Sequence, residues 1–235
     1  MKVDKNISVK NASWTFSGDV PKEFEDHVCK SVPLYKEGHQ LILELTDFFL
    51  HDHSLCYEIG CSTGLLSSQI AQRNSDKKVK VIGMDIEPDM VEYAKGKYGK
   101  TPRAQFIHQD IVSAELESCD LIISYYTIQF IPPKVRQLVF DKIYKSLNWG
   151  GAFLLFEKVR AKDARFQDIA TSLYTEYKIG QGYSSDEIIS KSKSLKGVLE
   201  PFSTQGNVDL MKRAGFVDVM SIMKYVCFEG FLAIK

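Results

Sequence analysis

Short apolar runs alternate with amphipathic segments through the middle of the chain. The apolar runs have the length of strands and are bounded by polar residues or glycine; they span residues 54–60, 80–86, 104–111, 119–126 and 152–158. The amphipathic segments have the apolar spacing of a helix; they span residues 64–73, 88–98 and 133–148. Strands and helices that alternate in this way predict a parallel sheet covered by helices on both faces.

The pattern changes on both sides of this region. Residues 21–30 and 36–50 have helical spacing, and we expect residues 1–50 to form an N-terminal arm or lid. Residues from about 160 to 200 look helical and polar. An insert of this length is usually functional, so we expect it to form a substrate cap. The chain closes with a helical pattern at 207–216 and two strand-like runs that are close enough in sequence to pair.

Together these elements predict a single α/β domain over residues 1–235. Its sheet is mostly parallel and ends in an antiparallel hairpin, with helices on both faces and the helical cap beside it. A chain of 235 residues with 44% apolar content can fill one large core.

The charge balance and the cysteines narrow the class of protein. Thirty basic and thirty acidic residues cancel, so nothing advertises a nucleic-acid surface. Five scattered cysteines without a C-x-x-C pair fit a reduced, intracellular protein, and the histidines form no metal-ligand pattern. The amino terminus lacks the apolar core of a signal peptide, and no apolar run approaches the roughly 20 residues that span a membrane. The sequence therefore predicts a cytoplasmic protein with neither nucleic acid nor membrane as a partner.

The stretch GCSTG, residues 60–64, fits two different kinds of site. As G-x-S-x-G it matches the turn that presents a nucleophilic serine in α/β-hydrolases. That chemistry needs a downstream histidine to take the serine proton, and residues 109–235 contain none. We therefore interpret the stretch as a glycine loop that binds a nucleotide-like ligand, and we expect that Ser62 is not a nucleophile.

The spacing of the loop indicates the kind of ligand. Gly60 and Gly64 let the backbone turn tightly and approach a ligand, and the following helix points its N–H groups at the loop. The spacing is E-x-G-x-x-x-G, with Glu58 before the first glycine, instead of the G-x-G-x-x-G that holds a diphosphate. This arrangement suits a ligand with an amino group and no phosphates.

Two further acids end the next two predicted strands. Asp85 stands where a carboxylate accepts both ribose hydroxyls, and Asp110 stands where it accepts a hydrogen bond from an adenine amino group. Taken singly, Asp85 could cap the next helix, Asp110 could be a turn residue and Glu58 could pair with a lysine. Three acids at three consecutive strand ends match adenosine attached to a cationic amino acid. The predicted cofactor is S-adenosyl-L-methionine, with S-adenosyl-L-homocysteine as its product.

With these motifs the sequence resembles the class I methyltransferase superfamily. Within it, the chain is similar to the carboxy-S-adenosyl-L-methionine synthases of the tRNA wobble-uridine pathway. The resemblance covers nearly the whole chain, and its most specific segments are WTF at 14–16, SVPLY at 31–35 and GYS at 182–184. The motifs shared with the wider superfamily are GCSTG at 60–64, MDIEPDM at 84–90 and QDI at 109–111.

The resemblance implies a Rossmann-like fold, a homodimer and a set of cofactor contacts. Carried over by position, these contacts are Tyr35, Gly60, Cys61, Ser62, Asp85, Ile86, Asp110 and Ile111. The family uses prephenate as carboxyl donor and converts the methyl group of the cofactor to a carboxymethyl group. We expect Tyr35 to cover the cofactor, since aromatic faces attract a sulfonium, and Trp14 and Phe16 to dock the N-terminal arm as core residues.

Two positions depart from the pattern of that family. Tyr125 stands where the family has an asparagine that faces the cofactor, and Ser192 stands where it has an arginine that binds the new carboxylate. An arginine grips a carboxylate through two hydrogen bonds, and a serine brings no charge to replace it. Lys191 or Lys193 could act in its place as a point charge, or both could belong to a solvated helix face.

These departures favour an enzyme that transfers a methyl group to a small-molecule acceptor by direct displacement, with no catalytic base assigned. Synthesis of carboxy-S-adenosyl-L-methionine from prephenate is the alternative, and a non-catalytic protein that binds S-adenosylmethionine or S-adenosylhomocysteine is a second one. Strand alternation lets only one tyrosine at the end of the fourth strand face the cleft, and the alignment favours Tyr125 over Tyr126. Glu157 could orient a substrate amine or pair at the surface. The remaining candidates for substrate contact are Tyr126, Tyr183, Lys191, Ser192 and Lys193.

Overall fold

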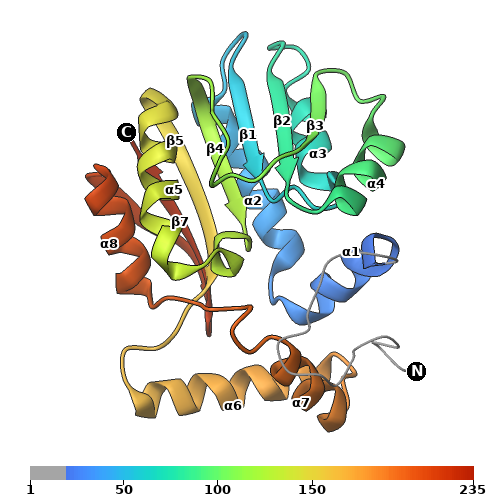
Figure 1. The fold of residues 1–235 in the computed structure, drawn as a ribbon, viewed down its shortest axis with the longest axis vertical. Coiled ribbons are helices and arrows are strands. Elements are labelled where there is room, and N and C mark those ends of the chain that lie inside the picture. Colours follow the sequence, from blue (N-terminus) through green and yellow to red (C-terminus); the bar gives the residue numbers. More distant parts are fainter. Residues whose placement is uncertain (1–19) are drawn as a thin grey trace.

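The computed structural model describes residues 20–235, which fold around one seven-stranded sheet (Figure 1). The strands are β1 Leu55–Ile59, β2 Lys80–Asp85, β3 Ala104–His108, β4 Cys119–Tyr125, β5 Leu147–Lys158, β6 Asp218–Tyr225 and β7 Phe228–Ile234. Their order in the sheet is β3-β2-β1-β4-β5-β7-β6. Strands β1 to β5 run parallel, and β7 runs antiparallel to β5 and β6. The predicted parallel sheet with a final antiparallel hairpin is confirmed.

Helices cover this sheet on both faces and at one end. They are α1 Val20–Ser31, α2 Tyr35–Phe49, α3 Leu65–Arg73, α4 Pro88–Tyr98, α5 Pro133–Ser146, α6 Ala164–Gly180, α7 Ser185–Ser194 and α8 Thr204–Ala214, with a short 3-10 helix η1 at Ile128–Phe130. Trp14 and Phe16, expected to dock the N-terminal arm, lie outside the described residues. Within residues 20–235, no helix combines the length and apolar composition that a membrane span requires.

Side chains that alternate along the strands build two separate cores. On one face, Ile122 of β4 joins a cluster that includes Phe140 of α5. On the other face, its neighbour Ile123 joins a cluster with Ile42 of α2 and Ile70 of α3. Successive strand residues point to opposite faces, so a strand buried on both sides must be apolar throughout. This explains the continuous apolar runs in the sequence.

Strand β5 begins five residues before the predicted start at residue 152. Cys119 pairs with Leu147 and Leu121 pairs with Ala152, so the register shifts between these pairs. The bulge takes up the extra residues of the NWGG segment, where Gly150 has a φ of 80°. Gly150 and Gly151 therefore belong to an irregular strand start.

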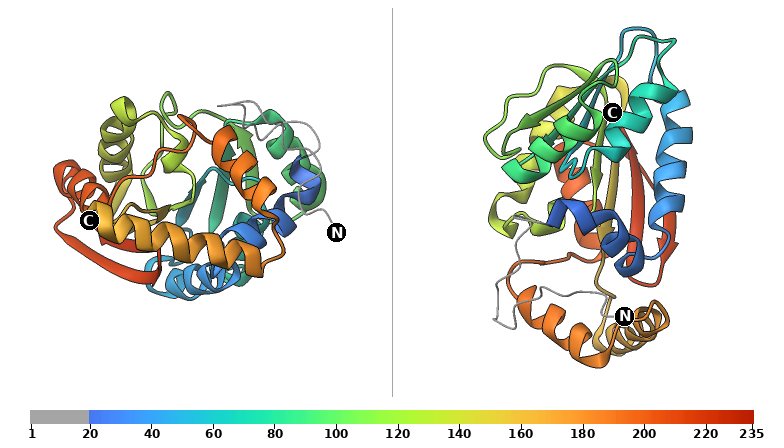
Figure 2. Two further views of the ribbon diagram at one scale, coloured as in Figure 1. Left: turned by 90° about the horizontal axis from the view of Figure 1, so that it is seen from below. Right: turned by 90° about the vertical axis from the view of Figure 1, so that its right-hand side faces the viewer.

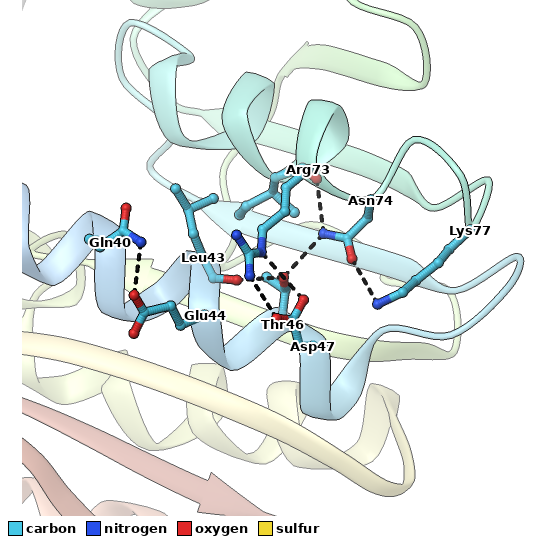
Figure 3. A network of polar contacts seen from close by, with 9 residues as sticks. Gln40, Leu43, Glu44, Thr46, Asp47, Arg73, Asn74 and Lys77 are labelled. Carbon is cyan, nitrogen blue, oxygen red and sulfur yellow. Dashed lines mark hydrogen bonds and ion pairs between the residues drawn. The ribbon is translucent and has the colours of Figure 1, made fainter.

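Polar contacts fix α2 against α3 (Figure 3). Asn74 donates from Nδ2 to Thr46 Oγ1 over 3.1 Å, and both side chains are buried. Arg73 Nη2 lies 2.6 Å from Asp47 Oδ2 at the exposed side of the same contact, where solvent screening weakens the ion pair. The buried bond therefore stabilises the packing more, and it holds the helix whose first turn carries Tyr35.

Helices α6 and α7 lie beyond the edge of the sheet at which the parallel strands end, and α1 lies on the same side (Figures 1 and 2). The Asp163 side chain accepts from the N–H of Phe166 and begins α6. Ser184 and Glu187 form a capping box that begins α7. The two ends of the segment meet, because the N–H of Arg160 donates to the carbonyl of Phe202 over 2.9 Å. Residues 161–201 thus form a cap tied to the sheet at its base.

Candidate active site

A cavity of about 900 Å³ lies at the edge of the sheet where the parallel strands end. Its walls come from the ends of β1, β2, β4 and β5, from α1 and α2, and from α6 and α7. Open α/β sheets bind their ligands outside the carboxyl ends of the strands. The predicted site residues that line it are Tyr35, Glu58, Gly60, Cys61, Ser62, Asp85, Ile86, Asp110, Ile111, Tyr125, Tyr126, Lys191 and Ser192.

Three predicted site residues lie outside the cavity lining. Gly64 has a φ of 81° and shapes the loop from behind, where a Cβ atom would collide with a neighbouring ring. Tyr183 is buried behind the wall, with its hydroxyl 2.8 Å from Ser31 Oγ. Lys193 is exposed, because residues two apart on a helix point to different sides and Lys191 takes the inner one. Tyr183 and Lys193 therefore do not face the space that a substrate would occupy.

The glycine loop has the geometry that its sequence predicted. Gly60 has a φ of 72°, and a Cβ atom there would collide with the Thr127 side chain. Its N–H donates to the carbonyl of Met84 over 2.8 Å, which ties the loop to the end of β2. Ser62 also has a positive φ, 51°, so its N–H turns toward Asp85. The loop thus presents main-chain groups to the cavity with no bulky side chain at its bend.

Glu58 is buried at the end of β1 and lines the cavity. Burial raises the pKa of its carboxyl group to about 8, although the Ser67 hydroxyl donates to it. A carboxyl group that has lost its water is stabilised in the charged form by a cation that reaches it. This end of the cavity therefore fits the amino group of an amino-acid ligand.

The other two acids hold main-chain groups as well as facing the cavity. Asp85 accepts from the N–H of Ser62 over 2.8 Å and from the N–H of Glu87 over 3.0 Å, one at each carboxylate oxygen. Asp110 accepts from the N–H of Val112 over 2.9 Å, so it also makes the turn that was the simpler interpretation. Each oxygen keeps further acceptor capacity. Ile86, beside Asp85, is 59% exposed and offers an apolar surface for a flat ring.

Both tyrosines after β4 line the cavity, so the expectation that only one would face it is wrong. Strand alternation stops at Tyr125, where β4 ends, and Tyr126 has a left-handed φ of 59°. The Tyr125 ring lies 5.0 Å from the Tyr35 ring, centroid to centroid, in an edge arrangement. Among the described residues, the buried Tyr126 hydroxyl has no hydrogen-bond partner. The three rings form an aromatic wall, which suits a sulfonium group.

Lys158, Lys178 and His39 are among the cavity residues that the sequence did not indicate. Lys158 is the last residue of β5, and Lys178 lies near the end of α6. His39 of α2 is buried, and burial lowers its pKa to about 4, so its imidazole is neutral at physiological pH. Lys158 could have been found by the criterion that identified the acids, because it is a polar residue at the end of a strand. Lys178 could not have been found in this way, because a lysine in a polar helix is unremarkable in sequence.

Glu157 takes neither of its two expected roles. It does not line the cavity and is only 2% exposed, so it is neither a substrate contact nor a surface residue. Burial raises its pKa to about 8, although Arg136 acts in the opposite direction. Within residues 20–235, no cluster of three or more His, Cys, Asp or Glu side chains is placed to hold a metal ion.

The fold and the site define a protein of the class I methyltransferase fold that binds S-adenosylmethionine. Residues 57–151 match the family described as "Methyltransferase domain". The chain belongs to the carboxy-S-adenosyl-L-methionine synthase family. It is 33% identical over 223 residues to the synthase of Campylobacter lari, covering 94% of both chains. It is 34% identical over 226 residues to the synthase of Staphylococcus epidermidis, covering 94% of this chain and 97% of that one.

Solved structures agree on the fold. Human N-acetylserotonin methyltransferase in complex with S-adenosylmethionine aligns with a TM-score of 0.63 at 18% identity, covering 93% of this chain but 56% of that one. The methyltransferase SibL in its apo form aligns with a TM-score of 0.64 at 15% identity, covering 93% and 60%. The resemblance drawn from the motifs is confirmed. The homodimer and the cytoplasmic location stay predictions.

Proposed function

We propose that the protein is a carboxy-S-adenosyl-L-methionine synthase that uses prephenate as carboxyl donor. The observation that carries this proposal is the place of Lys191. This lysine is 8% exposed and lines the cavity next to Ser192, the position of the family's carboxylate-binding arginine. Its Nζ atom contacts His27 and lies 2.9 Å from Ser31 Oγ, so it points into the interior between α7 and α1.

A cation beside Ser192 can bind the carboxylate that the uncharged Ser192 cannot bind. A carboxylate left unpaired in a desolvated site costs several kcal/mol, which would abolish selectivity for a carboxylated cofactor. The names of the relatives, with matches over 94% of this chain, support the same function. This alternative is therefore better supported than methyl transfer to a small molecule.

The described residues divide the work of binding and positioning. When bound, the cofactor would supply a sulfonium methyl group, and the electron pair of one of its C–H bonds would form the new bond to the carboxyl carbon of prephenate. Prephenate loses that carboxyl group and its ring hydroxyl to become aromatic, and the hydroxyl leaves with the methyl proton as water. Glu58 holds the amino group and Asp85 the ribose. Lys191 holds the carboxylate, and the aromatic wall excludes water.

Mass spectrometry of the reaction tests the proposal. The purified protein, incubated with S-adenosylmethionine and prephenate, is expected to form a cofactor heavier by one CO₂. The change Lys191→Met should reduce this product strongly, and Lys193→Met is the matched control because Lys193 is exposed on the same helix. If calorimetry shows the cofactor bound but prephenate leaves it unmodified, the proposal is wrong. Methyl transfer or a non-catalytic binding role would then explain the site.

A further inference from the structure

Two further lysines, Lys158 and Lys178, line the same cavity on the side away from Glu58 and Asp85. The Nζ atoms of Lys158 and Lys178 each lie 4.4 Å from the centroid of the Tyr174 ring. All three residues line the cavity. We propose that Lys158 and Lys178 form an anion site that binds a carboxylate of the donor substrate, an assignment that rests on the proposed function.

In the described part of the chain, neither lysine has an acidic partner. The lysines that do pair with carboxylates there are Lys95, Lys97 and Lys224, all at more exposed places. Burial lowers the pKa of both cavity lysines, and the charge of Lys158 helps to lower that of Lys178 to about 8. Two neighbouring cations without an anion are unfavourable in a desolvated wall. A bound carboxylate would offset that repulsion.

The Tyr174 ring, which both lysines contact, is held in place. The Tyr174 hydroxyl donates to the carbonyl of Ser31 over 2.8 Å, which links α6 to the end of α1. The same ring meets Phe228 of β7 at 5.1 Å, centroid to centroid, in an edge arrangement. An aromatic ring also attracts the ammonium groups beside it. The lysine pair is thus arranged before any ligand arrives, which lowers the entropy cost of binding.

The strand order separates the lysine pair from the acids. Strands β1, β4 and β5 are neighbours in that order, and adjacent strands lie about 4.8 Å apart. Lys158 at the end of β5 therefore lies roughly 10 Å along the sheet edge from Glu58 at the end of β1. Tyr125 and Tyr126 end β4 between them. The cavity has an acidic end that fits a cationic amino acid and a basic end that fits a carboxylate.

The charges also match the proposed donor. Prephenate carries two carboxylates, and the cavity offers a cation on α7, Lys191, in addition to the pair at β5 and α6. The exposed cavity-rim residues Arg160 and Lys196 keep their water and bind an anion more weakly. Lys178 is buried and Lys158 is half-buried, so this pair is the part of the wall best suited to select a carboxylate.

Calorimetry on the S-adenosylhomocysteine complex tests the site without turnover, with prephenate as probe. Lys158→Met and Lys178→Met keep most of the length of the unbranched side chain and remove its charge. We expect each variant to bind prephenate about tenfold or more weakly, since hydrogen bonds to charged groups are lost. Lys178→Arg should recover part of the affinity. The control is Lys162→Met, because Lys162 is exposed and outside the cavity.

The affinity for S-adenosylhomocysteine serves as the check that each variant is folded, and it should not change. If the wild type binds prephenate and both methionine variants bind it equally well, the lysine site is wrong and the proposed function stands. If the wild type does not bind prephenate, the donor is wrong and malonate becomes the probe. Malonate binding that is lost in Lys178→Met supports the anion site on its own. A wild type that binds no malonate overturns it.

Discussion

The Tyr125 hydroxyl donates a 2.6 Å hydrogen bond to the main-chain carbonyl of Tyr35. This bond joins the end of β4 to the first residue of α2, the helix from which Tyr35 and His39 line the cavity. Gly38, one turn further along α2, lies so close to the Tyr125 hydroxyl that it has no room for a Cβ atom. Tyr125, which departs from the family's asparagine, is thus fitted to a glycine on the facing helix.

Gly38→Ala is expected to destabilise the protein, because the new methyl group must displace the Tyr125 ring or the helix. Overpacking of this kind costs about 1–3 kcal/mol. The matched control is Gly96→Ala on α4, where a Cβ atom meets nothing within 4 Å. That change should leave stability unchanged or raise it by up to about 1 kcal/mol. Urea unfolding of both variants measures the difference, and equal effects would contradict the close fit.

Asp85→Ala is expected to lose most of the affinity for S-adenosylhomocysteine. The carboxylate faces the cavity and also holds the N–H of Ser62, so its loss removes a ribose acceptor and loosens the glycine loop. Glu92→Ala is the control, since Glu92 is exposed on α4 and, within residues 20–235, pairs only with Lys95. Calorimetry measures both. An affinity that survives in Asp85→Ala would show that the ribose assignment is wrong.

The free energy of unfolding should fall as the pH rises from 6.5 to 8. Burial raises the pKa of Glu58 and Glu157 to about 8 from 4.5, so the folded state holds protons that the unfolded state has released. Each such proton lowers stability by up to about 1.4 kcal/mol per pH unit in this window. The lowered pKa of His39 changes the free energy of unfolding only below pH 6.5, the ordinary pKa of the histidine side chain, so it does not contribute in this window.

Glu157→Gln tests this pH dependence without touching the cavity. The amide cannot titrate, so the slope between pH 6.5 and 8 should become flatter, whatever the change in absolute stability. Urea unfolding at several pH values gives the slope for wild type and variant. An unchanged slope would mean that Glu157 is ionised in the folded protein.

Ser62 should not react with a serine-directed fluorophosphonate. Its hydroxyl lies 3.7 Å from the sulfur of Met90, and no histidine bonds to it. Without a base the hydroxyl is a poor nucleophile. Intact-mass analysis is expected to show no adduct. Stoichiometric labelling that disappears in Ser62→Ala would restore the hydrolase interpretation.

The acidic end of the cavity was predictable because local rules determine it. A strand that ends in an acid, a glycine loop and a following helix bring Glu58 and Gly60 to the sheet edge wherever the rest of the chain goes. Asp85 follows from the same rule one strand later. The order of the strands then brings these residues together, and the parallel alternation of elements was enough to expect it.

The basic end was not predictable from local patterns. Lys178 faces the cavity only because α6 crosses the edge of the sheet. The sequence of a polar helix has no apolar periodicity that would indicate which of its faces is turned toward the protein. Comparing Ser192 with the family's arginine position by position suggested that a positive charge had been lost. In the structure Lys191, one residue earlier on the same helix, lines the cavity. Tyr126 was misjudged because its left-handed φ breaks the alternation that the strand pattern implied.

The hydrogen bond between the Arg160 N–H and the Phe202 carbonyl closes the base of the cap. Because the chain leaves and rejoins the sheet at one point, the distance between β5 and α8 does not depend on what lies between them. The cap can therefore change in length and sequence while the strands of the sheet keep their register. Lys178 and Lys191 both belong to the cap, whereas Glu58 and Asp85 belong to strands β1 and β2. Selection on this fold can therefore alter the basic side of the cavity and leave the acids at the strand ends untouched.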